Sequence, residues 1–192
     1  MTLKYQLIIL ALLFNQVSDA EEFLPNHPRV ILETTEGTIM LELDSKKAPI
    51  TVRNFIELVD KKFYNRTVFH RVIPGFMIQG GGFNKDLEKK ESSKTIANES
   101  GNGISNLRGT IAMARTVQPH SAGSQFFINV EDNLALNPNS NNWGYAVFGY
   151  VIDGMDIVDK ISETPTSSSG RFKSDVPIVP IIITKARLEK GI

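Results

Sequence analysis

The chain is dominated by short apolar runs of strand length, and only two segments show helical spacing. Residues 38–43 show the strand pattern most clearly, because Ile39, Leu41 and Leu43 share one face of an extended chain. Similar strand-like runs occupy residues 29–35, 109–114, 124–130, 145–151 and 176–188. Many short strands with so few helices favour an all-β barrel.

Two helices are expected to cover the core. Pro49 opens the first, at a position where its missing backbone donor does no harm. Its apolar residues at helical spacing are Val52, Phe55, Ile56, Val59 and Phe63. Residues 155–162 form the second helix, with Asp153 as a candidate N-cap. Neither helix suggests chemistry.

Composition indicates one ordinary globular domain. The 192 residues include 21 basic and 21 acidic ones, so net charge points to neither nucleic acid nor an anionic membrane surface. Cysteine is absent, which excludes thiol catalysis and thiolate metal sites. His27 and His120 lack metal-ligand spacing, and we expect no metal and no cofactor.

The first 20 residues have the features of a secretory signal peptide. Lys4 supplies the positive start, and residues 7–14 form an apolar run too short to span a bilayer. Ser18 and Ala20 are the small residues expected before a cleavage site. We therefore predict cleavage after Ala20 and export to the periplasm or beyond the cell.

A retained membrane anchor is the alternative interpretation of this segment. Asn15 and Gln16 follow the apolar run directly and argue against it. With the signal peptide removed, residues 21–28 would be a mobile lead-in to one domain at residues 29–192. The mature protein is then expected to have no membrane contact and to be a monomer.

One run sets two polar side chains among large apolar ones. Residues 69–81 read FHRVIPGFMIQGG. Arg71 and Gln79 lie an even number of positions apart, so they would share a face of an extended chain. Pro74 and Gly75 indicate a bend between them, which weakens that count. The pair would suit a groove for an uncharged, partly apolar ligand, such as a peptide bond beside a proline.

The same run resembles the signature of cyclophilins, the peptidyl-prolyl cis-trans isomerases. Three further runs are similar in the family's order: GTIAMAR at 109–115, GSQFFI at 123–128 and YAVFG at 145–149. The resemblance spans roughly residues 29–188 and is strongest to exported cyclophilins of bacteria. It implies an eight-stranded antiparallel closed barrel capped by two α-helices, with a substrate groove on the outer wall.

The resemblance also implies roles for individual residues. Arg71 would be the catalytic residue, donating to the prolyl nitrogen as the amide twists. The substrate-binding residues would be Phe76, Met77, Gln79, Met113, Ala114, Arg115, Gln125, Phe127, Leu136 and Tyr145. From the pattern alone, Arg71 could instead form a surface ion pair, and the apolar members could be core. Arg115 lies where the family binds substrate through backbone groups.

Three further positions, His70, Tyr145 and Ala135, bear on the activity and on inhibitor binding. His70 is a possible general base, but the implied reaction transfers no proton, which favours a hydrogen-bonded structural histidine. Tyr145 stands where eukaryotic members often carry histidine, and it keeps an apolar ring with a polar tip. Ala135 falls where they carry a tryptophan important for binding cyclosporin. Isomerase activity should survive, whereas inhibitor sensitivity should not.

The leading functional hypothesis is an isomerase acting on X-Pro bonds of folding exported proteins, with proline-containing polypeptides as partners. A binding module or chaperone could use the same groove without turnover, but it would be free to lose Arg71. A purely structural barrel would explain the strands and not the groove residues. Residues 83–103 are polar and are expected to form a surface excursion, or to recruit a partner.

Overall fold

The computed structural model describes residues 27–92 and 94–189. The expected signal peptide at 1–20 and residues 21–26 of the lead-in lie outside the described residues. The elements, with η for 3₁₀ turns, are β1 (Arg29–Thr34), β2 (Thr38–Leu43), α1 (Pro49–Asp60), β3 (Thr67–Val68), β4 (Arg71–Ile73), β5 (Met77–Gly80), η1 (Ser100–Asn102), β6 (Thr110–Met113), β7 (Phe126–Asn129), η2 (Leu134–Leu136), β8 (Val147–Asp153), α2 (Met155–Ser162), β9 (Thr166–Ser169), β10 (Phe172–Pro177) and β11 (Ile182–Leu188).

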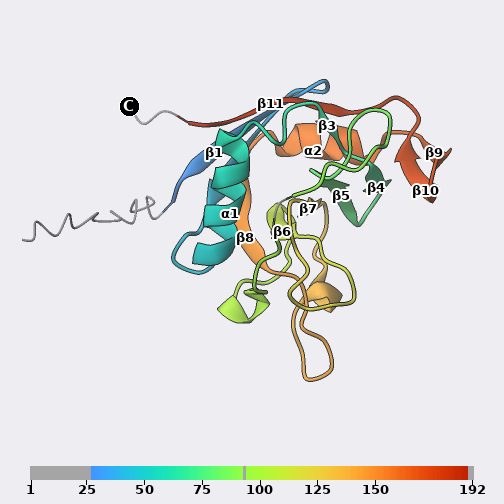
Figure 1. Ribbon diagram of the computed structural model, residues 1–192. Coiled ribbons are helices and arrows are strands. Elements are labelled where there is room, and N and C mark those ends of the chain that lie inside the picture. Colours follow the sequence, from blue (N-terminus) through green and yellow to red (C-terminus); the bar gives the residue numbers. More distant parts are fainter. Residues whose placement is uncertain (1–26, 93, 190–192) are drawn as a thin grey trace, which may run out of the picture.

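A curled antiparallel sheet forms a half-barrel, which confirms the expected fold class (Figure 1). Its strand order is β3-β11-β1-β2-β8-β6-β7-β5-β4. The two edge strands, β3 and β4, are joined by Phe69 and His70 alone, so the sheet must curl until its edges approach each other. The main sheet therefore has nine strands, counting β3 and β4 separately, and it is a half-barrel where a closed barrel of eight strands was expected.

The inner face of the sheet encloses an aromatic core. The Phe55 ring of α1 packs 4.9 Å from Tyr64, 5.6 Å from Phe126 and 5.1 Å from Phe148, measured between ring centroids. Helix α1 packs beside β11, and α2 packs against β2, β4 and β5. No helix within the described ranges is long and apolar enough to cross a membrane. Side chains thus fill the space enclosed by the curled sheet, and any ligand groove must lie outside it.

Both helices lie where the sequence predicts them, with differences at their ends. Helix α1 begins at Pro49 and ends before Phe63, which is partly buried in the following turn. Helix α2 is capped by Gly154, with φ +82°, and Asp153 instead ends β8. A side chain at residue 154 would overlap the Thr38 carbonyl, so glycine makes this turn from strand to helix.

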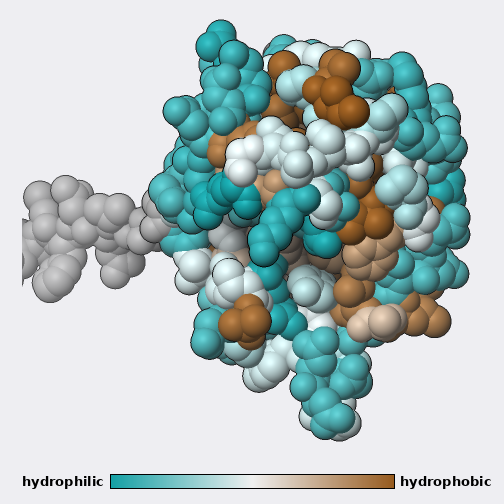
Figure 2. All heavy atoms as spheres, turned by 90° about the vertical axis from the view of Figure 1, so that its right-hand side faces the viewer, coloured by the Kyte–Doolittle hydropathy of each residue, from teal (hydrophilic) through white to brown (hydrophobic). Residues whose placement is uncertain are grey.

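The C-terminal run does not form one strand from 176 to 188. It divides into β10 and β11, and Ile178 and Val179 lie exposed between them. Pro177 and Pro180 cannot donate to a sheet, which explains the break. β10 pairs with β9 in a separate two-stranded sheet that lies beside β4. Figure 2 turns this face to the viewer and shows separate apolar clusters among hydrophilic side chains.

Residues 83–103 are more than a surface loop. Phe83, Ile96 and Ser100 are buried, and Ile96 forms a β-bridge with Ala122. The Glu99 carboxylate accepts hydrogen bonds from the first turn of α1, at 2.8 Å from the Thr51 backbone nitrogen. A carboxylate at a helix N-terminus satisfies free N–H groups and complements the helix dipole. The excursion therefore helps to fix α1.

Candidate active site

The β4–β5 hairpin places Arg71 and Gln79 on the outer face of the sheet. Its register pairs Arg71 with Gln79 and Val72 with Ile78. Val72 and Ile78 are completely buried in the barrel core. Because cross-strand partners point to the same side of a sheet, Arg71 and Gln79 must both point away from that core.

Strand β7 extends this outer face with an aromatic side chain. Phe127 pairs with Gln79 of β5 and with Ala112 of β6. Phe127, Met77 and Ala112 belong to a small apolar cluster that is separate from the barrel core. The alternation of β7 thus puts Phe126 inside the barrel and Phe127 on its outer wall.

A pocket of about 180 Å³ opens on this outer wall. Its nine lining residues are Arg71, Phe76, Met77, Gln79, Ala114, Arg115, Phe127, Leu136 and Tyr145. All nine are among the eleven residues that the sequence predicts for the site. They come from strands β4, β5 and β7 and from the β4–β5, β6–β7 and β7–β8 connections. The pocket combines apolar side chains with two guanidinium groups, those of Arg71 and Arg115, and the amide of Gln79.

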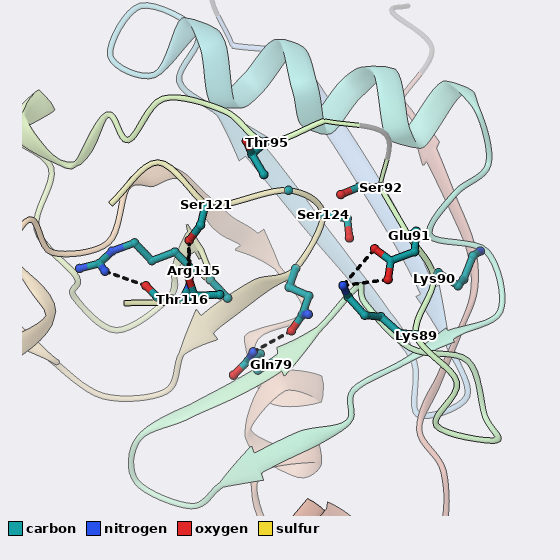
Figure 3. A pocket seen from close by; sticks show the side chains of 13 residues that line it. Gln79, Lys89, Lys90, Glu91, Ser92, Thr95, Arg115, Thr116, Ser121 and Ser124 are labelled. Atoms are coloured by element: carbon teal, nitrogen blue, oxygen red, sulfur yellow. Dashed lines mark hydrogen bonds and ion pairs between the residues drawn. The ribbon is translucent and has the colours of Figure 1, made fainter. Parts of the chain in front are cut away.

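Gln125 lies at an adjoining hollow of about 300 Å³, which shares Gln79, Ala114 and Arg115 with the pocket. The Gln79 Nε2 group donates a 3.1 Å hydrogen bond to Gln125 Oε1, drawn as a dashed line from Gln79 in Figure 3. A side chain at Gly82 would overlap that of Gln125, so glycine there permits the approach. The two amides form a continuous polar edge between the hollows.

Arg115 is held by the neighbouring loop. Its Nε donates to the Gly144 carbonyl at 2.8 Å, and a terminal nitrogen donates to Asn142 Oδ1 at 2.9 Å. The guanidinium also lies 4.8 Å from the centroid of the Tyr145 ring. Tyr145 in turn packs edge-on against Phe127, with ring centroids 5.5 Å apart. Arg115 therefore fixes one wall of the pocket, and its donors are already engaged.

Met113 lies away from the other predicted site residues. Its side chain is buried in the barrel core, and its backbone nitrogen donates to the Ala146 carbonyl at 3.0 Å. Ala112 contributes to the outer apolar cluster instead. The strand period could have indicated this arrangement, since alternating side chains along β6 must point to opposite faces.

His70 is buried beside the pocket and does not line it. Its ring lies 4.5 Å from that of Phe83 and 5.5 Å from that of Phe172, measured between centroids. Burial lowers its pKa to about 4, and contributions from the Val68 backbone and Gln125 oppose that shift. Nδ1 has no hydrogen-bond partner among the described residues. A neutral, enclosed imidazole fits a structural role better than proton transfer.

Unlike Arg115, Arg71 is not hydrogen-bonded to the loop that contains Asn142 and Gly144. Its side chain is 44% exposed, and its Nε lies 3.5 Å from Oδ2 of Asp175 on β10. Asp175 could not be identified from the sequence, because no local pattern connects it to the β4–β5 hairpin. No group of three or more His, Asp or Glu side chains within the described ranges could hold a metal ion.

Comparison with known proteins gives a consistent family. The family model described as "Cyclophilin type peptidyl-prolyl cis-trans isomerase/CLD" matches residues 29–186. The chain is 52% identical over 161 residues to peptidyl-prolyl cis-trans isomerase A of Dickeya dadantii, covering 84% of each protein. It is 51% identical over 157 residues to peptidyl-prolyl cis-trans isomerase B of Escherichia coli, covering 80% of this chain and 95% of that protein.

Solved structures agree with this result. A cyclophilin-type peptidyl-prolyl cis-trans isomerase of Cryptosporidium parvum superposes with a TM-score of 0.71 at 27% identity, covering 86% of this chain and 99% of that one. A structure of the same protein in the presence of the dipeptide Ala-Pro gives a TM-score of 0.69 at 28% identity. The chain belongs to the cyclophilin-type peptidyl-prolyl cis-trans isomerases.

Proposed function

We propose that the outer-wall pocket is where this isomerase binds proline and rotates the X-Pro bond. The observation that carries the proposal is the position of Arg71 and Gln79, paired across the hairpin above Met77 and Phe127. Rotation about a peptide bond has a barrier of about 18–20 kcal/mol, because the amide has partial double-bond character. The reaction makes and breaks no covalent bond, so stabilising the twisted amide is sufficient.

Arg71 would supply the electrostatic part of that stabilisation. As the amide twists, the prolyl nitrogen becomes pyramidal and gains a lone pair that can accept a hydrogen bond. A guanidinium is permanently charged and offers several donors to such an acceptor. This interaction is stronger in the twisted state than in the planar one, which is the condition for catalysis.

The apolar floor would act on the same equilibrium in a second way. The planar amide has more charge separation than the twisted one, so it loses more on leaving water. A proline ring resting on Met77 and Phe127 would place the amide in that drier environment. Gln79 and Gln125 would hold the substrate backbone through their amides, and the backbone of Ala114 and Arg115 would bind the extended chain.

We further propose that the substrates are exported polypeptides and that the enzyme acts as a monomer in the periplasm or outside the cell. The support for export is the charged start, apolar run and small residues of the first 20 positions. Mass spectrometry of the mature protein should find Glu21 at its N-terminus. A full-length product retained in the cytoplasm would contradict export.

The binding-module alternative makes a different prediction for turnover. Exchange spectroscopy by NMR on a short Ala-Pro peptide measures cis-trans interconversion directly, with no coupled protease. The isomerase should accelerate exchange at a small fraction of the peptide concentration. Saturable binding with no acceleration of exchange would instead identify a holding function.

A further inference from the structure

The ion pair between Arg71 and Asp175 joins the pocket to a separate part of the fold. Asp175 lies on β10, in the β9–β10 sheet that packs beside β4 and is not hydrogen-bonded into the main sheet. Its Oδ2 lies 3.5 Å from Arg71 Nε, and it is the ion-pair partner that the described residues provide for Arg71. The contact therefore links the proposed catalytic cation to a carboxylate that lines no part of the pocket.

The backbone at Asp175 has a left-handed conformation. Its φ is +68°, in the left-handed region that residues other than glycine seldom occupy, although aspartate tolerates it better than most. The pairing of β10 with β9 shifts register between Phe172 and Val176. Such bulges turn a side chain away from the regular alternation of a strand. Here the irregularity directs the carboxylate toward β4.

Both sides of this bulge are anchored. Phe172 packs with its ring centroid 5.5 Å from that of His70 and 5.1 Å from that of Phe83. Val176 and Pro177 are buried on the other side. Asp175 is thus fixed by its neighbours although its own side chain is 31% exposed. A carboxylate held in this way can orient a flexible partner.

Arg71 needs such a partner. Arg71 lies on the edge strand β4, and its long side chain, which ends in the guanidinium, is 44% exposed. Its cross-strand neighbour Gln79 directs its amide donor to Gln125. The carboxylate of Asp175 approaches Nε and not the two terminal nitrogens of the guanidinium, and Arg71 itself lines the pocket.

We infer that Asp175 is a positioning residue for Arg71, holding the guanidinium by its Nε side so that the terminal donors face the twisting prolyl amide. This inference rests on the proposed role of Arg71. Asp175 is not among the residues that line the pocket, so substrate binding should be preserved when it is altered. The loss should appear in kcat.

The test uses Asp175→Asn, which keeps the shape of the side chain and its tolerance of positive φ while removing the charge. Glu36→Gln is the matched control, because it breaks a surface ion pair with Lys160 between the β1–β2 hairpin and α2. Exposed pairs contribute modestly, so Asp175→Asn should lower kcat about twofold to fivefold with KM nearly unchanged. Glu36→Gln should match the unmodified protein.

Two readouts separate positioning from a merely structural role. The Nε–H resonance of Arg71 should shift in Asp175→Asn and stay in place in Glu36→Gln, whether or not substrate is present. In an Arg71→Lys background, Asp175→Asn should lower kcat no further, since the fork that Asp175 orients is already gone. Thermal unfolding of each variant establishes that the fold survives.

An unchanged kcat and an unchanged Arg71 resonance in folded Asp175→Asn would overturn the inference and leave the isomerase assignment intact. A rise in KM with normal kcat would overturn it as well, because Asp175 would then act on binding. Failure of the unmodified protein to accelerate X-Pro exchange would refute the proposed function itself, and that arm is read before any variant.

Discussion

Arg71 and Gln79 lie directly opposite each other in the register of the β4–β5 hairpin, on the face that points away from the barrel core. The next cross-strand pair of the hairpin, Val72 and Ile78, is fully buried on the other face. The same two strands thus build the core with one set of side chains and the pocket with the other. Changes at the outer positions can therefore alter chemistry without creating a cavity in the core.

Phe127→Ala should weaken both the pocket and the fold. The side chain is buried on the outer wall against Met77, Ala112 and Tyr145. Removing a buried phenylalanine side chain should reduce the free energy of unfolding by about 3 kcal/mol. Urea unfolding measures that loss, and peptide titration should show weaker binding. Phe127→Leu is the control and should retain most of both; equal effects of the two variants would contradict the apolar-floor role.

His70 should make the free energy of unfolding decrease at acidic pH, because burial lowers its pKa in the folded state. Above pH 6.5 the imidazole is neutral in both states, so it has no effect there. Below pH 6.5 the imidazole is protonated in the unfolded chain, whereas in the folded chain it stays neutral down to about pH 4. The free energy of unfolding should therefore fall as pH decreases through this window, by about 3 kcal/mol at most from this group, and stay lowered below it.

The comparison of unmodified protein with His70→Gln isolates this effect, since carboxylate titrations are common to both chains. Urea unfolding at a series of pH values should give a shallower acid dependence for the variant between pH 6.5 and 4. Parallel curves would show that His70 is not held neutral by burial.

Much of this architecture could be predicted from local pattern. The alternation in residues 38–43 and the apolar spacing after Pro49 are set by neighbours in the chain, and both elements lie where expected. The shared face of Arg71 and Gln79 was also predicted, although by counting along an extended chain. The structure gives a different cause, because the two residues are cross-strand partners around the Pro74-Gly75 turn.

What the sequence could not predict depends on contacts between distant segments. Asp175 adjoins Arg71 only because the β9–β10 sheet packs against β4, and no spacing rule encodes that contact. Glu99 was assigned to a surface excursion, yet its carboxylate caps α1. Met113 is a different case, because it was grouped with the pocket by resemblance although the local strand alternation could have indicated that it is buried in the core.

Ala135 predicts weak binding of cyclosporin. The residue lies exposed on η2, next to Leu136 of the pocket lining, and it offers no indole to the inhibitor. Ala135→Trp should tighten binding measured by calorimetry, because a large aromatic surface then flanks the pocket. Leu134→Trp places the same ring one residue away and should not. Tight binding by the unmodified protein would show that Ala135 does not occupy the expected position.

The proposed mechanism depends on donation from the Arg71 guanidinium to the twisting prolyl amide. Losing a charged hydrogen bond removes roughly 1.5–3 kcal/mol, so Arg71→Ala should lower kcat/KM at least on the order of tenfold. Arg187→Ala is a close control, because Arg187 is 42% exposed and pairs through Nε with Glu33, away from the pocket.

NMR exchange on an Ala-Pro peptide, with circular dichroism and thermal melting of each variant, is the most direct measurement. Folded Arg71→Ala should still bind the peptide and lose most of its turnover, while Arg187→Ala should keep its activity. Normal turnover by folded Arg71→Ala would instead show that Arg71 is not the catalytic donor and that the proposed mechanism is wrong.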